Sequence, residues 1–451
     1  MKWALVILAG CSFKGPAISP GAPSDGASPA DGTHVDGPQT NPDAAAGTLG
    51  PPGGVDATLA LWLVGDDAQH SGNTVTGWPD RGPNHLDLAV DSARTAPIWN
   101  PPTSTTAATL KLSNSRLARA SGLLPLNTTM SDITLVAVVK DDTSSAFEWL
   151  LYNGTIGFDR LSISRSWNGS PMRWDFDATT SYRDSSTQSD GRAMVMTLVA
   201  SVGSTVSGAN HRELFVNGVA TGGSAQFAAY VSTGKPLEVG DHDDGMGGDS
   251  SRNPYDGYVG EIYLASSTPQ SQTELEQLET YFALRYGIAL AHPYRDATGA
   301  IVWDTGSGYD THISGLAVDP AAHLDVRAAS ATDGGDLLRI EAQALPVGSH
   351  LYLIGGDNNQ GVAYTAGRLQ RVWRFLGGTW GTAVTIDVAG PGSLGGTVAL
   401  PSQGANQVTM LVDTTPGFAN PIPIPMVAGA NHRLTASVVL PATAYVTFAV
   451  Q

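Results

Sequence analysis

Cysteine is nearly absent from this chain of 451 residues, with Cys11 as its one thiol. No disulfide can form within the chain, so its stability must come from burial, from hydrogen bonding or from a metal. Charge is also scarce, at 14% of residues, and 41 Asp and Glu outnumber 24 Lys and Arg, for a formal net charge of -17. Such a chain is repelled by nucleic acid and by anionic lipid surfaces. The composition therefore argues against nucleic acid as a partner.

Long apolar runs are missing at the N-terminus, where residues 3–10 are too few to span a bilayer as a helix. Residues 8–11 read LAGC and resemble the lipobox of bacterial lipoproteins, in which the cysteine is lipidated and becomes the mature N-terminus. The resemblance implies a signal peptide over residues 1–11, a lipid on Cys11, and a place in the outer membrane or on the cell surface. The alternative is a free, buried cysteine in an apolar segment.

Apolar side chains are rare in residues 12–54, where Gly, Pro, Ser, Ala and Asp dominate. A segment of this composition buries too little surface to offset its ordering entropy. We expect a disordered tether that holds the rest of the chain away from a membrane.

Short strands and turns dominate the chain after residue 54. The chain has 53 Gly and 28 Pro, which favour turns over long helices. Asn217-Gly218 and Asn168-Gly169 each predict a hairpin turn with positive φ. The predicted strands of the first half are residues 59–64, 132–140, 147–152, 160–164, 172–176, 193–201 and 212–216.

One segment predicts a helix, residues 271–287. Ser271 and Glu274 form a capping box, apolar residues recur along one face, and Gly287 is placed to end the helix. It directly follows a predicted strand, GYVGEIYLAS.

These closing motifs resemble a known family. LEVGDHDDG followed by DGYVGEIYLAS and the helix is similar to the last third of a bacterial LamG-like jelly roll of the concanavalin A type, and ALWLVGDD with GWPDRGPNHLDL resembles its opening. The resemblance covers residues 55–290 and implies an all-β antiparallel sandwich with one C-terminal helix. Residues 291–451 again read as strands and resemble an uncharacterised β-rich domain found after such jelly rolls in exported bacterial proteins, so we expect a second, smaller β-sandwich.

Catalytic motifs are not found: there is no HExxH, no G-x-S-x-G and no P-loop. A glycosidase needs paired carboxylates facing one cleft. Asp175 and Asp177 alternate with apolar residues and predict a solvent face, and Glu148 and Glu261 have no acidic partner two residues away. We therefore interpret these four as ordinary surface carboxylates and predict no catalytic residue. The histidines are scattered in apparent loops and are interpreted as solvated: His70, His85, His211, His242, His292, His312 and His323.

Tryptophan supplies one candidate ligand contact. Trp62, Trp149 and Trp174 lie inside strand patterns and are predicted to be core. Trp167 stands at a predicted hairpin tip, SRSWNGS, where a ring has little to pack against unless a loop or a ligand covers it. We take Trp167 as a candidate for the binding surface, with packing on a neighbouring loop as the alternative.

Calcium is the one cofactor that the sequence suggests. The loop LEVGDHDDGMGGDSSRNPYDG interleaves acidic residues with glycine, and calcium takes carboxylate and carbonyl oxygens from such flexible loops. The spacing matches no EF-hand, so ordinary solvated carboxylates are the alternative. The candidate ligands are Asp241, Asp243, Asp244, Asp249 and Asp256.

The order of these parts predicts a surface-tethered, non-catalytic binding or adhesion lipoprotein that recognises a glycan or protein ligand outside the cell. Two other functions stay open. One is a polysaccharide-degrading enzyme, a hydrolase or lyase, with an unrecognised site. The other is a structural envelope protein that binds its own kind.

Overall fold

A computed structural model provides the structure. It describes residues 51–450 except 104, 120–121, 123–126, 143–147, 156–157, 167–172, 179–183, 186–190, 204–209, 225–226, 228, 233, 242–253, 270, 333–336, 345–349, 363, 366, 378–379, 390–407 and 430–432. The predicted signal peptide, nearly all of the predicted tether, and the Asn168-Gly169 turn lie outside these residues.

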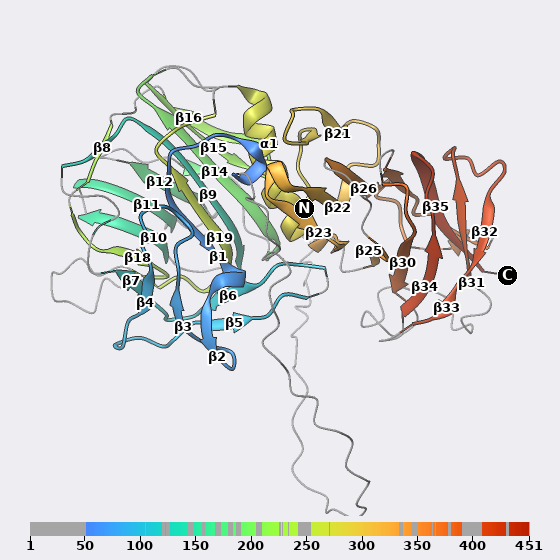
Figure 1. Ribbon diagram of the computed structural model, residues 1–451, viewed down its shortest axis with the longest axis horizontal. Helices are drawn as coiled ribbons and strands as arrows, with labels where there is room; N and C mark the ends of the chain where they lie inside the picture. Colours follow the sequence, from blue (N-terminus) through green and yellow to red (C-terminus); the bar gives the residue numbers. More distant parts are fainter. Residues whose placement is uncertain are drawn as a thin grey trace, which may run out of the picture. The chain divides into compact units, whose positions relative to one another are not determined.

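The first part of the described chain is an antiparallel β-sandwich, so the predicted all-β jelly roll is confirmed (Figure 1). In one layer β19 pairs with β1 and β9, and β9 pairs in turn with β14. In the other layer β10 pairs with β11 and β18. The strands are β1 (Leu59–Val64), β2 (Gln69–Ser71), β3 (Thr74–Trp78), β4 (Leu88–Val90), β5 (Ile98–Asn100), β6 (Thr109–Leu112), β7 (Leu117–Arg119), β8 (Thr129–Met130), β9 (Asp132–Asp141), β10 (Glu148–Thr155), β11 (Phe158–Ser166), β12 (Arg173–Ala178), β13 (Asp184–Ser185), β14 (Ala193–Ser201), β15 (His211–Val216), β16 (Val219–Ser224), β17 (Tyr230–Val231), β18 (Leu237–Val239) and β19 (Gly257–Ala265).

Strand β9 is buried on both faces. Successive side chains of a strand point to opposite faces of the sheet. Leu135 and Val139 lie in the core between the two layers, whereas Val136 and Val138 belong to a second hydrophobic cluster on the outer face. The outer face of β9 is therefore covered by another part of the chain.

That cover begins with the helix α1 (Gln272–Tyr286), which confirms the predicted helix (Figure 1). The Ser271 hydroxyl accepts a hydrogen bond from the backbone N–H of Glu274 at 3.2 Å. Gly287 ends the helix in the left-handed conformation, with φ of 63°, and a Cβ there would approach the carbonyl oxygen of Ser330 to 2.1 Å. Glycine is thus required both by the backbone angle and by the close approach of a later segment.

The predicted disordered tether is wrong for its last residues, which form a short turn. Residues Pro52–Gly54 form a 3-10 turn (η2) in which Pro52 and Gly53 are buried, and this turn packs against α1. Proline and glycine predict a linker by composition, but here they fit closely against the helix.

The second part of the chain is also a β-sandwich, as predicted. A nine-stranded sheet includes β22, β26, β29 and β35, and a five-stranded sheet has the order β24-β25-β30-β34-β33. Its strands are β20 (Tyr294–Arg295), β21 (Ile301–Trp303), β22 (Thr311–Asp319), β23 (Leu324–Val326), β24 (Ala328–Ser330), β25 (Leu338–Ala342), β26 (Leu351–Asp357), β27 (Tyr364–Thr365), β28 (Arg368–Leu369), β29 (Trp373–Leu376), β30 (Val384–Ala389), β31 (Val408–Asp413), β32 (Ile422–Pro425), β33 (Val427–Ala428), β34 (Arg433–Val438) and β35 (Thr443–Val450).

One hydrophobic cluster contains residues from both parts. It joins Val138 of β9 and Tyr281 of α1 to Trp303, Ile313 and Ile354 of the second part. The boundary that the sequence predicts after residue 290 stays a prediction, and this cluster shows that side chains on both of its sides share a core.

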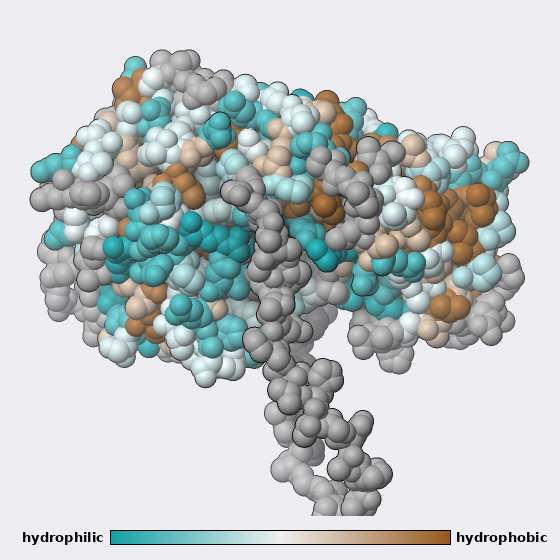
Figure 2. All heavy atoms as spheres, viewed as in Figure 1, coloured by the Kyte–Doolittle hydropathy of each residue, from teal (hydrophilic) through white to brown (hydrophobic). Residues whose placement is uncertain are grey.

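Hydrophobic residues reach the surface over the last strands of the chain (Figure 2). Ile422, Val427 and Val439 are the most exposed large aliphatic residues there, at 65%, 57% and 60%. Among the described residues, strand β32 pairs only with β31, and it carries Pro423 and Pro425. Because proline has no backbone N–H, this edge is a poor template for a further strand. No helix in the described part of the chain is both long and apolar enough to cross a membrane.

Candidate functional site

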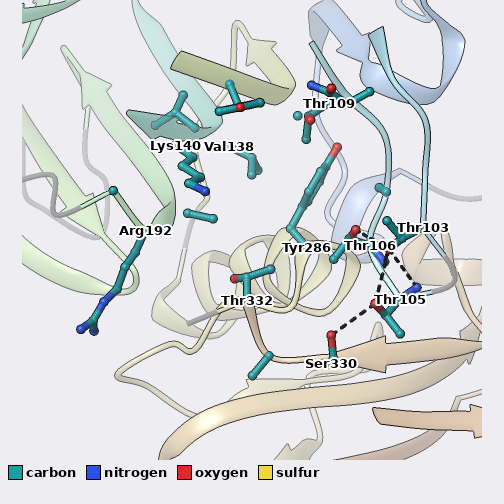
Figure 3. A pocket seen from close by; sticks show the side chains of 18 of the residues that line it. Thr103, Thr105, Thr106, Thr109, Val138, Lys140, Arg192, Tyr286, Ser330 and Thr332 are labelled. Atoms are coloured by element: carbon teal, nitrogen blue, oxygen red, sulfur yellow. Dashed lines mark hydrogen bonds between the residues drawn. The ribbon is translucent and has the colours of Figure 1, made fainter. Parts of the chain in front are cut away.

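A cavity of about 710 Å³ opens on the outer face of the sandwich, where the cover provided by α1 ends (Figure 3). Four parts of the chain form its wall: the segment from β5 to β6, the ends of β9, β14 and β19, the end of α1, and the segment around β24 and β25. The described lining residues are Asn100, Pro101, Thr103, Thr105, Thr106, Ala107, Thr109, Val138, Val139, Lys140, Gly191, Arg192, Ala193, Tyr258, Gly260, Tyr286, Ser330, Ala331, Thr332 and Arg339.

Strand register places two lysines on either side of one tyrosine. Tyr258 of β19 is opposite Lys111 of β6 on one side and opposite Lys140 of β9 on the other. The Nζ atoms of Lys111 and Lys140 lie 4.8 and 5.5 Å from the centre of the Tyr258 ring. Both distances are typical of a cation–π contact.

The two lysines differ in their other partners. Lys111 Nζ donates to Asp142 at 2.6 Å and to Asp256 at 2.8 Å. Burial alone would lower the pKa of Lys111, but these carboxylates outweigh it and raise the pKa. Lys140 is exposed, lines the cavity, and has no carboxylate partner among the described residues. In Figure 3 Lys140 points into the cavity, whereas Arg192 extends away from its centre.

Hydroxyl groups form the opposite wall. The Thr103 hydroxyl lies 2.7 Å from that of Thr106 and accepts the backbone N–H groups of Thr105 and Thr106 at 3.2 and 3.1 Å. The hydroxyls of Ser330 and Thr105 lie 3.2 Å apart, which ties the loop to β24. These contacts link the three threonines to one another and to β24 (Figure 3).

Next to the lining residues Gly260 and Tyr286 lies a buried carboxylate, Glu261, with 0% exposure. Trp62 Nε1 donates to its Oε1 at 2.5 Å, Tyr281 Oη to the same oxygen at 3.1 Å, and Tyr286 Oη to its Oε2 at 3.3 Å. Gly260 next to it has no side chain, and a Cβ there would meet the Tyr286 ring at 2.4 Å. Glycine at this position lets Tyr286 reach Glu261.

The charge of this network is balanced by Arg285. Its Nε lies 3.6 Å from Glu261 Oε2, and its guanidinium also pairs with Asp66. Burial raises the pKa of Glu261 against the opposing effect of Arg285. Burial would lower the pKa of Arg285, but Tyr281, Glu261 and Asp66 raise it well above its ordinary value. The interpretation of Glu148 and Glu261 as surface carboxylates is therefore wrong, because both are buried, at 4% and 0% exposure, by segments distant in sequence.

The solvated interpretation of the histidines is wrong for His292, which is 8% exposed. Its Nε2 lies 2.7 Å from Oε2 of Glu279, a fully buried residue of α1. Burial opposes protonation, yet the hydrogen bond and charge of Glu279 raise the pKa of His292. His70 and His85 are exposed, as expected.

The candidate calcium ligands are placed only in part. Asp241 is fully buried and pairs with Arg94, and Asp256 pairs with Lys111. Each of these carboxylates therefore already has a cationic partner. Asp243, Asp244 and Asp249 lie outside the described residues. Among the residues that are described, no three His, Cys, Asp or Glu side chains are grouped as metal ligands.

Of the other predicted site residues, Cys11 and Trp167 also lie outside the described part. Trp62 and Trp149 are buried, at 6% and 4% exposure, as predicted. The Trp174 side chain, and those of Asp175 and Asp177, are not described. Sequence reasoning missed Lys140, Tyr258 and the threonines, because a lysine ending a strand and a Thr-rich connection are common and only the fold brings them together.

Comparison with known proteins gives one partial family match and distant structural likenesses. Residues 274–443 match a family model described as a domain of unknown function, DUF8202. This match agrees with the uncharacterised second domain that the sequence suggests, and it begins inside α1. No curated protein matches the chain.

Among solved structures, domain 4 of a Geobacillus stearothermophilus arabinanase in complex with arabinotriose is 12% identical and covers 50% of this chain and 98% of its own, with a TM-score of 0.36. A Ruminococcus gnavus sialidase carbohydrate-binding module bound to sialyllactose is 15% identical and covers 35% of this chain and 95% of its own, with a TM-score of 0.26. The botulinum neurotoxin DC binding domain in complex with rat synaptotagmin II is 8% identical and covers 87% and 94%, with a TM-score of 0.38. With TM-scores this low, these structural similarities do not indicate what this chain binds.

Proposed function

We propose that the protein is a binding protein that takes part of a glycan into the cavity beside Tyr258 and does not cleave it. The observation that carries the proposal is the lining of this cavity. Its volume of about 710 Å³ is that of a small-ligand site. Threonine and serine hydroxyls, an amide and two tyrosines line it, and these groups suit the hydroxyls and apolar ring faces of sugars.

The described lining also bears on whether a bound glycan could be hydrolysed. Glycoside hydrolysis uses two carboxyl groups that flank the scissile bond. No Asp, Glu or His is among the described residues of the lining. The nearby Glu261 does not line the cavity, and its oxygens are engaged by Trp62, Tyr281 and Tyr286. A turnover assay decides between a binding protein and the polysaccharide-degrading enzyme.

The test is a glycan array combined with a turnover assay. Thr332 is exposed and lines the cavity, so Thr332→Trp fills the space that a ligand needs. Thr414 is equally exposed but lies in a turn of the second part, so Thr414→Trp is the matched control. We expect saturable binding by the wild type and by the control, at least about tenfold weaker binding by Thr332→Trp, and no release of reducing ends. Released product would favour the enzyme, and unchanged binding by Thr332→Trp would remove the cavity from the site.

A lipid on Cys11 and a place at the outer membrane or cell surface belong to the same proposal. They rest on the LAGC motif and the Gly- and Pro-rich segment after it. A lipoprotein cysteine carries several acyl chains, and these anchor firmly where one chain does not. We expect Cys11→Ser to move the protein from the membrane fraction to the soluble fraction.

Calcium in the acidic loop is a separate proposal, supported by the Asp- and Gly-rich sequence alone. A metal that binds the folded state raises the melting temperature by mass action. Identical melting curves in millimolar calcium and in chelator would remove calcium from the function.

A further inference from the structure

Cationic side chains line the cavity of a protein whose formal net charge is strongly negative. Its described lining includes Lys140, Arg192 and Arg339 and no carboxylate, although acidic residues outnumber basic ones by 41 to 24 in the whole chain. Lys140 is the member that Figure 3 shows pointing into the space.

The contrast with Lys111 makes this charge informative. Both lysines stand beside the Tyr258 ring, in the two strands β6 and β9 that pair with β19 on its opposite sides. Lys111 is neutralised by Asp142 and Asp256. Lys140 keeps the aromatic contact and, among the described residues, has no acidic partner.

The position of Lys140 suits an anion held against a sugar. An ammonium beside an aromatic ring, within a partly enclosed space, attracts an anion more strongly than one in open water because screening is weaker there. The Thr103, Thr105 and Thr106 loop and Ser330 supply hydroxyl groups across the cavity. A ligand that spans both walls needs hydroxyl groups on one side and a negative group on the other.

We propose that the ligand is an acidic glycan, whose carboxylate or sulfate group is bound by the ammonium of Lys140 beside Tyr258. This inference rests on the proposed function and names its substrate class.

The experiment compares sugars that differ only in charge: oligogalacturonate and its methyl ester, and sulfated and unsulfated dextran fragments, with sodium sulfate as the anion alone. Titration calorimetry is run with the wild type, Lys140→Gln and Lys140→Arg. Lys235→Gln, at an exposed lysine outside the lining, controls for net charge.

We expect at least one acidic sugar to bind about tenfold or more tightly than its neutral counterpart, and binding to weaken with salt. Lys140→Gln should abolish the difference within each pair, Lys140→Arg should retain most of it, and Lys235→Gln should change little. Because Lys140 is exposed, unchanged melting of Lys140→Gln is expected and verifies its fold.

Three results would overturn the inference in distinguishable ways. Equal binding of charged and neutral sugars, or an unaffected Lys140→Gln, removes the anion site but leaves glycan binding intact. Sodium sulfate that binds as tightly as the sulfated sugar shows that the sugar is not recognised. No saturable binding to any member of the panel overturns the proposed function together with this inference.

Discussion

The two faces of the β1-β19-β9-β14 layer are both largely buried, and they are chemically unlike. On the inner face of β9 and β19 the side chains are aliphatic, such as Leu135, Ile262 and Leu264. On the outer face of β19 Tyr263 packs near the buried Glu261, which binds residues of β1 and α1. The inner face is a hydrophobic core within one sandwich. The outer face is closer to an interface, where polar groups are matched to partners from distant parts of the chain.

The difference explains where the cavity lies. The outer face carries Glu261 and Tyr263 where α1 covers it, and this helix extends only as far as Tyr286. Beyond the helix the same face continues as Tyr258 and Lys140, and these two residues line the cavity. A ligand site can thus arise where a helix covers only part of one face of a sheet and leaves the rest of that face open.

The largest expected effect tests the outer face. Glu261→Ala removes one of the two carboxylates beside the buried Arg285, leaving Asp66, and it removes the acceptor of the Trp62 and Tyr281 donors. Removal of one member of a buried ion pair costs about 3 to 5 kcal/mol. We expect a loss of that size in the free energy of unfolding, measured by urea denaturation. Glu341→Ala, at an exposed strand residue, is the control, and a loss for Glu261→Ala as small as for the control would contradict the network.

A substitution on the inner face should lower the free energy of unfolding only through the side-chain volume that is lost. Leu135 is fully buried, so Leu135→Ala opens a cavity and should cost about 2 to 5 kcal/mol. The loss should be the same at low and at high salt, because no charge is involved. Val219, at 49% exposure, provides the control, and Val219→Ala should stay within about 0.5 kcal/mol of the wild type.

A smaller, pH-dependent effect should separate the faces further. The folded state raises the pKa of His292 above its ordinary 6.5, so the stabilisation from its pair with Glu279 is fully present below pH 6.5. It is lost as the pH rises through the higher folded-state value. His292→Asn should cost about 1 to 3 kcal/mol at pH 6 and flatten the decline of stability above that pH.

The control for this prediction is His85→Asn, because His85 is exposed and has φ of 47°, a conformation that asparagine tolerates. Urea denaturation between pH 5.5 and 9 measures both variants. Parallel curves for the wild type and His292→Asn would show that the pair does not titrate in this range.

The smallest effect on stability is expected at Lys140, which lies beyond the end of α1. Lys140 is exposed, so Lys140→Gln should change the free energy of unfolding by less than about 0.5 kcal/mol. A large loss would mean that Lys140 belongs to the internal interface rather than to a ligand site. Thermal and urea unfolding of the variant distinguish the two.

Local sequence determined the elements. Three such local signals are the nearly continuous apolar run in 132–140, the Asn217-Gly218 turn with φ of 49° and 79°, and Ser271 and Gly287 at the ends of α1. Each acts over a few residues, so each is predictable from the sequence. Glu148 and Glu261 are interpreted as surface carboxylates because neither has an acidic partner two residues away, and His292 is interpreted as solvated because it lies in an apparent loop. Neither local pattern shows which distant segment covers a residue.

Tertiary structure alone decided the candidate site. Lys111, Tyr258 and Lys140 are far apart in sequence and meet through strand register, and the threonine loop meets Ser330 only because the second sandwich packs back on the first. Which of two similar lysines is neutralised depends on where Asp142 and Asp256 fall in space. Burial and charge pairing are sums over contacts between distant segments, and no pattern of neighbouring residues contains them.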